Sequence, residues 1–311
     1  MTTTSSAPGK IILFGEHAVV YGRPALAIPV TQVLATATVS KSARPGIWIE
    51  APNINLSSEL SGLAPDQPLA AVVSSVIKTL NISRPPACTV YLQSTIPMAA
   101  GLGSGAAASV AVIRALSAFL GHPLSDEQVN KLAYESEKLY HGTPSGIDNN
   151  VITYARPVYF VKGRAIKTFR VGAAFTLVIG DTGITALTKK SVGDVRKLWE
   201  ADQPRWEKVF DRIGEIVWDA RQAIERGDCL ELGKLMDANH SLLQDLTVSS
   251  EELDCLVVAA RKAGAIGAKL SGGGRGGNMI ALVLKENAPA LAEALLSAGA
   301  KRTITTTVHP K

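Results

Sequence analysis

The sequence predicts an α+β protein of two domains, and three observations support this fold class. The chain has 311 residues, which is about twice the length of a usual single domain. Strand-like and helix-like segments are mixed without the strict alternation of a parallel α/β sheet. Hydrophobic residues make up 46 % and charged residues 19 %, which excludes disordered, collagen-like and coiled-coil chains. We expect an N-terminal domain over 1–170 and a C-terminal domain over 171–311.

The first half of the chain predicts short strands and amphipathic helices. Residues 9–40 form strand, turn and strand, because β-branched and apolar runs surround Gly15 and Gly22. Apolar residues at helical spacing predict a helix over 66–81. The later elements are a strand at Cys88–Ser94, a glycine-serine turn at Gly101–Gly105, and helices over Ala106–Leu120 and Ser125–Tyr140.

The second half predicts a run of helices between strands. The helices cover Lys189–Leu198, Trp206–Glu225, Leu230–Leu246, Ser250–Ala263 and Asn287–Ala298, and the strands cover Val158–Val161, Phe175–Gly180, Ala268–Leu270 and Met279–Leu284. Ser250 is the expected N-cap of its helix, since a serine there can accept a backbone hydrogen bond.

Charge and cysteine usage limit the class of partner. The formal net charge is +5, but the basic residues do not form long tracts, so we expect a small polyanionic ligand rather than nucleic acid. Cys88, Cys229 and Cys255 are far apart and form no CxxC pair, which is typical of a reducing cytoplasm. The Thr/Ser-rich N-terminus lacks the features of a signal peptide, and we expect no association with a membrane.

The strongest local signal is the segment from Pro97 to Ala108, which reads PMAAGLGSGAAA. Its glycines allow tight turns and close approach to a ligand, and an Ala-rich helix begins directly after them. The free N–H groups at such a helix N-terminus favour a phosphate. No Gly-Lys-[Ser/Thr] follows, so this is not a Walker A loop. A plain glycine-rich helix cap is the alternative.

Three further segments carry candidate chemistry. Lys269–Gly277 is a second glycine loop, in which Arg275 offers a charge for a phosphate. In a third segment, Glu137 is a candidate metal ligand and Asp148, on a rigid loop after Pro144 and Gly146, a candidate general base. In Pro8–Gly22, Lys10 begins an apolar strand where its amine could pair with a carboxylate. Taken singly, each acid, lysine or histidine here is more often a solvated or structural residue.

Together, and in this order, the four segments resemble the GHMP kinase superfamily and, within it, the mevalonate kinases. The match at Gly15–Gly22, GEHAVVYG, is the most specific, and the resemblance spans residues 7 to about 285. It implies a fold with an N-terminal domain similar to ribosomal protein S5 domain 2 and a ferredoxin-like C-terminal domain, with ATP and substrate meeting in the cleft. It also implies ATP- and Mg²⁺-dependent phosphorylation of (R)-mevalonate to 5-phosphomevalonate in isoprenoid biosynthesis, by a cytoplasmic homodimer.

The resemblance assigns roles by position. Asp148 would take the proton from the substrate hydroxyl, and Lys10 would lie close to it and stabilise developing charge. Ser104 and Glu137 would hold Mg²⁺. Substrate contacts fall to Glu16, His17 and Thr188. Contacts to ATP fall to Pro97, Gly101, Leu102, Gly103, Ser104, Gly105, Ala106, Ala107, Gly273 and Arg275.

The sequence departs from the family pattern at a few positions. Gly105 replaces a second serine, and Ser271, Gly273 and Arg275 replace the usual Thr, Ala and Gly. Ala186 stands where some members carry a basic residue near the substrate, so the partner of the substrate carboxylate is not assigned. Another GHMP kinase, such as phosphomevalonate kinase, and an inactive nucleotide or isoprenoid sensor are the alternative functions.

Overall fold

The computed structural model describes residues 2–97, 100–141, 144–164, 166–185 and 188–310. It divides the chain into two compact units. The first unit consists of residues 1–10, 29–97 and 102–156, and the second of residues 11–28, 98–101 and 157–311. Strands β1 (Thr2–Phe14) and β2 (Ala25–Lys41) begin in one unit and end in the other, so the chain passes between the units at several points.

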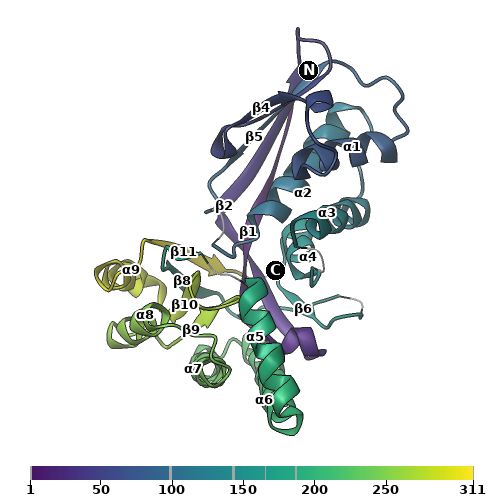
Figure 1. Cartoon of the computed structure of the whole chain (residues 1–311). Coiled ribbons are helices and arrows are strands. Elements are labelled where there is room, and N and C mark those ends of the chain that lie inside the picture. The colour runs from purple at the N-terminus through teal and green to yellow at the C-terminus, as the bar shows by residue number, and fades with distance from the viewer. Residues whose placement is uncertain (1, 98–99, 142–143, 165, 186–187, 311) are drawn as a thin grey trace. The chain divides into compact units, whose positions relative to one another are not determined.

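A sheet and a group of helices form the first unit. The strands follow the order β4 (Leu56–Glu59), β3 (Ile47–Ala51), β5 (Cys88–Ser94) and β2, and β1 pairs with β2. β2 and β5 are antiparallel, with Ala35 opposite Ser94, whereas β3 and β5 are parallel. The helices are α1 (Pro68–Thr79), α2 (Ser104–Phe119), α3 (Asp126–His141) and α4 (Ile147–Tyr154), labelled in Figure 1.

Helix α2 is the centre of this unit. It contacts α1, α3, α4 and β5. Its sequence SGAAASVAVIRALSAF has high helix propensity, and its small side chains allow neighbouring helices to approach closely. Most of its residues are buried, from Ala106 in the first turn to Phe119 at the end. The helix therefore holds its N-terminal end, where the glycine loop lies, in a fixed position.

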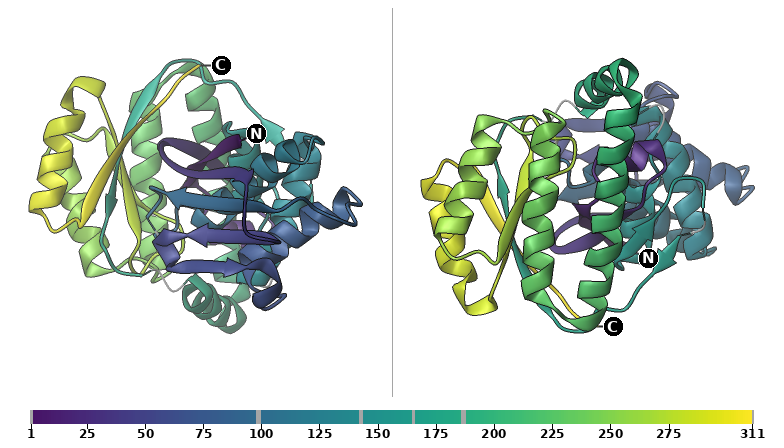
Figure 2. Two further views of the ribbon diagram at one scale, coloured as in Figure 1. Left: turned by 90° about the horizontal axis from the view of Figure 1, so that it is seen from above. Right: turned by 90° about the horizontal axis from the view of Figure 1, so that it is seen from below.

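The second unit contains an antiparallel sheet with the order β11-β8-β10-β9. The strands are β8 (Phe175–Asp181), β9 (Gly267–Ser271), β10 (Asn278–Val283) and β11 (Arg302–Val308). Numbered along the chain this order is 4-1-3-2, with helices between strands 1 and 2 and between strands 3 and 4, as in ferredoxin-like folds. α7 (Cys229–Asp245), α8 (Glu251–Lys262) and α9 (Ala288–Ser297) contact its strands, as Figure 2 shows.

Further elements of the second unit flank this sheet in sequence. α5 (Thr188–Ala201) is followed by α6 (Gln203–Arg226), which packs on α7 and on the short 3-10 helix η1 (Ala18–Tyr21). The hairpin of β6 (Val158–Phe160) and β7 (Lys167–Thr168) pairs with the beginning of β2. The α+β fold class is confirmed, including the ferredoxin-like order of the C-terminal sheet. Among the residues that the structure describes, no helix is long and apolar enough to cross a bilayer.

Several predicted boundaries are wrong by a few residues, and some elements were missed. β1 begins at Thr2, well before the predicted start. Strands β3, β4 and β11 were not predicted at all. The segment expected to be a rigid loop around Asp148 is the first turn of α4, which starts at Ile147 after Gly146 with a left-handed φ of 89°. The predicted N-cap is confirmed, since the Ser250 side chain accepts a hydrogen bond from the Leu253 N–H.

Candidate active site

In the first unit, the structure brings Lys10 and Asp148 together. Lys10 Nζ lies 3.0 Å from Asp148 Oδ1, with 7 % of the lysine side chain and 26 % of the aspartate side chain exposed. Lys10 is held by its strand, and its N–H donates to the Leu102 carbonyl over 2.9 Å. Asp148 lies in the first turn of α4, where the helix dipole favours a negative charge. A shielded ammonium therefore lies against a carboxylate that solvent or substrate can reach.

The phosphate-loop glycine Gly103 lies directly against this pair. A Cβ atom at Gly103 would be 2.8 Å from Ile152 Cδ1, 3.0 Å from Lys10 Cγ and 3.4 Å from Asp148 Oδ2. Its φ of 72° also lies in the left-handed region, which favours glycine. The loop and the Lys10–Asp148 pair can approach this closely only because position 103 has no side chain.

The N-terminus of α2 has the local features of an anion site. Gly103 is its N-cap and offers no capping side chain, and no acidic residue lies in the first turn. The first backbone N–H groups of a helix have no partner within the helix, and together with the dipole they favour a phosphate. Ser104 begins the helix, Gly105 follows, and Ala106 and Ala107 are buried. Pro97, before the loop, is also buried.

Glu137, on α3, is a buried carboxylate near the Lys10–Asp148 pair. It is 3 % exposed. Burial and, to a smaller extent, the charge of Asp148 raise the pKa of Glu137 to about 7, against the opposing effect of the Lys10 ammonium. The donor chemistry fits magnesium, which takes oxygen ligands and is often held by one or two carboxylates together with substrate phosphates. Glu137 and the Ser104 hydroxyl supply such oxygens.

In the second unit, Glu16 is buried against a lysine that the sequence analysis did not single out. Glu16 is 1 % exposed, and its Oε1 accepts from the ammonium of Lys269, whose side chain is wholly buried. Lys269 Nζ also donates to the Leu270 carbonyl over 2.6 Å. A lysine within an otherwise apolar strand was the signal that could have identified it.

His17 follows with a strained backbone and a fixed ring. Its φ is 61°, and its Nε2 lies 3.1 Å from the Gly273 carbonyl. Burial lowers the pKa of His17 to about 4, and the charge of Arg275 lowers it too, against the hydrogen bond to Gly273. The ring is therefore neutral near pH 7. Since a carbonyl only accepts, Nε2 carries the proton and Nδ1 is an acceptor.

Thr188 and the second glycine loop lie beside His17 in the same unit. A Cβ atom at Gly273 would be 2.7 Å from Thr188 Oγ1, so the two residues are in close contact. Arg275 has a left-handed φ of 56° and its Nη1 donates to Asp194 on α5, while its Nε donates to the Thr247 carbonyl over 3.2 Å. Part of the guanidinium is thus engaged by the protein, and its contact with a phosphate stays a prediction.

The structure thus gathers the predicted residues in two groups. Lys10, Gly103, Ser104, Glu137 and Asp148 belong to the first unit, and Glu16, His17, Thr188, Gly273 and Arg275 to the second. Gly101, in the second unit, has a left-handed φ of 73°, and no atom of the described residues lies within 4 Å of where its Cβ would be. Ala186 lies outside the described parts.

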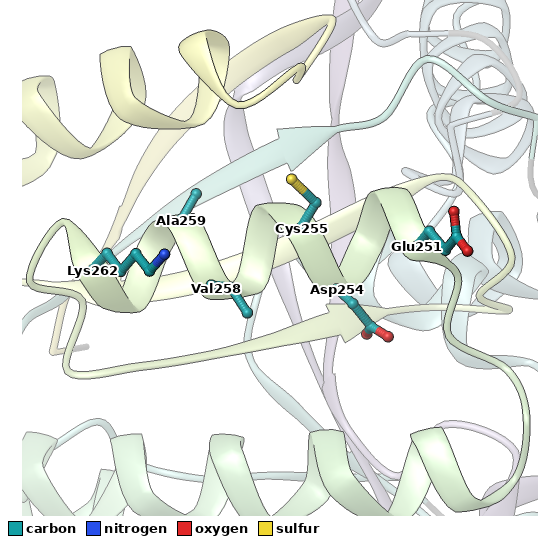
Figure 3. A pocket seen from close by; sticks show the side chains of 6 residues that line it. All are labelled: Glu251, Asp254, Cys255, Val258, Ala259 and Lys262. Atoms are coloured by element: carbon teal, nitrogen blue, oxygen red, sulfur yellow. The ribbon is translucent and has the colours of Figure 1, made fainter.

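A hollow elsewhere on the second unit carries none of these residues. It has a volume of about 470 Å³ and runs along α8, where Glu251, Cys255 and Lys262 are among its lining residues. Figure 3 shows the lining side chains projecting from this one helix. Cys255 Sγ lies 3.7 Å from the Ala298 carbonyl.

Comparisons with known proteins agree with this geometry. The family model "GHMP kinases N terminal domain" matches residues 69–156, and "GHMP kinases C terminal" matches residues 220–301. The chain is 37 % identical to a mevalonate kinase of Thermococcus sibiricus over 98 % of its own length and 96 % of that protein. The chain belongs to the GHMP kinase family.

Solved structures with the same fold include two relevant complexes. L. major mevalonate kinase in complex with R-mevalonate has a TM-score of 0.88 and 31 % identity, over 99 % of this chain and 96 % of that one. Streptococcus pneumoniae phosphomevalonate kinase in complex with phosphomevalonate and AMPPNP has a TM-score of 0.82, over 98 % of this chain and 99 % of that one. The latter is 17 % identical, so it supports the shared GHMP fold alone.

Proposed function

We propose that this GHMP kinase transfers the γ-phosphoryl group of ATP to the primary hydroxyl of (R)-mevalonate, forming 5-phosphomevalonate and ADP for isoprenoid biosynthesis. The observation that carries the proposal is the Lys10–Asp148 pair at 3.0 Å, packed against Gly103 of the phosphate loop. The identity with mevalonate kinases over nearly the whole chain supports mevalonate as the acceptor.

The site residues of the first unit have separate roles in this transfer. The Asp148 carboxylate accepts the proton of the attacking hydroxyl, and the hydroxyl oxygen then forms a bond to the γ-phosphorus as the bond to ADP breaks. The Lys10 ammonium holds Asp148 in place and stabilises negative charge that develops near it. The N–H groups at the start of α2 bind the phosphates of ATP.

Magnesium and the remaining contacts complete the proposal. Mg²⁺ neutralises phosphate charge when bound, and Ser104 and Glu137 are the residues that would hold it. Gly273 and Arg275 contact ATP, whereas Glu16, His17 and Thr188 contact the acceptor. The free thiols of Cys88, Cys229 and Cys255 support a cytoplasmic location. A homodimer is part of the same proposal, on the resemblance alone.

The test is ADP release by the purified protein with Mg-ATP and a panel of alcohols. The panel holds mevalonate, phosphomevalonate, galactose and homoserine, and Asp148→Ala is the control. We expect turnover with mevalonate alone, and its loss in the variant. Turnover with phosphomevalonate instead would keep the mechanism and replace the acceptor. Bound ATP without turnover on any alcohol would contradict the proposal in favour of a nucleotide sensor.

A further inference from the structure

Lys269 is a buried charge that the proposed reaction does not yet use. Its side chain has 0 % exposure, on a strand whose other residues are also buried. Removing an ammonium from water is costly unless an opposite charge and hydrogen bonds replace the water. Glu16 supplies the charge and the Leu270 carbonyl a hydrogen bond, and the Phe14 ring centroid lies 5.8 Å from Nζ. A leucine or methionine would fill such a position without this cost.

The ion pair is one of three bonds that join the same two segments. The Ser271 hydroxyl donates to the Ile12 carbonyl over 2.7 Å, and His17 Nε2 donates to the Gly273 carbonyl over 3.1 Å. These bonds hold residues 12–17 and 269–273 side by side within the second unit. Glu16 lies in the turn between β1 and η1, and its contacts with β9 and the glycine loop help to set its position.

Glu16 and His17 each keep one buried acceptor without a partner. Glu16 Oε1 is engaged by Lys269, but Oε2 is buried and accepts no hydrogen bond from the residues that the structure describes. His17 Nδ1 is also buried and has no hydrogen-bond partner among the described residues. Because Nε2 carries the ring proton, Nδ1 is an acceptor. A buried acceptor without a hydrogen bond is unfavourable, because it has lost its contact with water. A ligand with hydroxyl donors can satisfy both acceptors.

We propose that Lys269 is a positioning residue for the acceptor alcohol: it holds Glu16 through Oε1, so that Oε2 is presented to a substrate hydroxyl. This inference rests on the proposed function, because it takes the acceptor to be the alcohol that is phosphorylated. It assigns to Lys269 an effect on the binding of the acceptor and none on the binding of ATP.

The charges around the pair make Glu16 dependent on Lys269. From α7, His240 Nδ1 accepts the Leu270 N–H over 3.3 Å, and its Nε2 lies 3.1 Å from Asp254 Oδ1 on α8. Burial lowers the pKa of His240 to about 4, so its ring is neutral near pH 7. His17 is neutral for the same reason, and Arg275 is paired with Asp194. Lys269 is the cation that bonds Glu16 in the described structure.

Removal of the lysine therefore has a pH signature. A buried carboxylate without its cation takes up a proton, and a protonated Glu16 can rotate its own O–H toward other acceptors. In Lys269→Met we expect KM for mevalonate to rise about 10- to 100-fold, as for a lost hydrogen bond to a charged group. The increase in KM for mevalonate becomes larger as the pH falls from 9 to 6, whereas KM for ATP changes by less than about twofold.

The experiment compares Lys269→Met, Glu16→Gln, the double variant and Lys285→Met by steady-state kinetics from pH 6 to 9. Lys285 is an exposed lysine in the same unit, so Lys285→Met controls for the loss of one charge. Glu16→Gln is expected to raise KM for mevalonate without the pH dependence. The double variant should match Glu16→Gln, because Lys269 then has nothing to position. The double variant leaves no unpaired buried charge. It can therefore be measured even if Lys269→Met alone does not fold.

Three results would overturn the inference. The first is an equal loss of kcat/KM for mevalonate and ATP at every pH, which a general structural role predicts. The second is a double variant in which the effects of the two single substitutions on KM for mevalonate add. The third is an unchanged KM for mevalonate in Lys269→Met. Failure of the proposed function is distinct from these, because it is read from the wild-type enzyme on the alcohol panel. If another alcohol is the substrate, the same ratios are measured with that alcohol.

Discussion

Gly103→Ala tests the contact between the phosphate loop and the Lys10–Asp148 pair. The added Cβ would lie 2.8 Å from Ile152 Cδ1 and 3.0 Å from Lys10 Cγ, so at least one of these side chains must move. A non-glycine residue in the left-handed region costs about 1–2 kcal/mol, and overpacking adds about 1–3 kcal/mol. We therefore expect Gly103→Ala to lower the free energy of unfolding by about 2–5 kcal/mol. Because a shift of about 1 Å in reacting groups can reduce rates about 100-fold, kcat should fall as well.

Gly121→Ala is the matched control. Gly121 follows the other end of α2 in the same unit, with a φ of 81° and no atom within 4 Å of where its Cβ would be. Gly121→Ala introduces the backbone strain without a steric clash. We therefore expect it to lower the free energy of unfolding by about 1–2 kcal/mol and to leave kcat unchanged. Hydrogen exchange of the α2 amides measures stability in the unit concerned, and ADP release measures kcat. Equal stability losses in the two variants, with kcat unchanged in both, would refute the reasoning.

Three further predictions concern single side chains. Lys10→Met should lower kcat for phosphoryl transfer at least tenfold with little change in ATP binding, because it removes the cation at Asp148; unchanged kcat would contradict this role. Arg275→Gly should weaken ATP binding more than twofold while Asp194→Asn does not; equal losses, measured by calorimetry, would identify the bridge rather than a phosphate contact as the function of Arg275. Burial lowers the pKa of His240 to about 4, so the unfolded chain binds a proton below about pH 6.5 that the folded chain does not, and the free energy of unfolding falls as the pH drops from 6.5 toward 4. Urea unfolding at pH 7 and 4.5 measures this fall in the free energy of unfolding, and His240→Gln should reduce the fall by up to about 3 kcal/mol. An equal fall in the wild-type protein and the variant would contradict the prediction.

Local signals in the sequence predicted the parts of the site that depend on local structure. The Ala-rich run after the glycines predicts α2, and helix propensity together with a glycine N-cap places its first turn within two residues. Gly101 and Gly103 have the left-handed φ angles for which glycine was expected there. Such features depend on residues a few positions apart, so one sequence suffices to identify them.

Features that depend on distant contacts were not predictable in this way. β11 has the Thr-rich sequence RTITTTV and is a strand because it pairs with β8, more than 120 residues earlier in the chain. α4 has only eight residues, and its packing on α2 and α3 stabilises a helix too short to be marked by periodicity. The Glu16–Lys269 pair joins residues 253 positions apart. Lys269 alone is marked by its apolar strand, but no local signal indicates that Glu16 is its partner.

The most direct test of the central claim is the turnover of Asp148→Asn with Mg-ATP and mevalonate, together with the affinity for both substrates. The amide keeps the shape of the side chain but cannot accept the hydroxyl proton. We predict that kcat falls about 10²- to 10⁴-fold, as for the loss of a general base, while the dissociation constants of ATP and mevalonate change by less than about tenfold. A variant that keeps near wild-type kcat would contradict the assignment of Asp148 as the base.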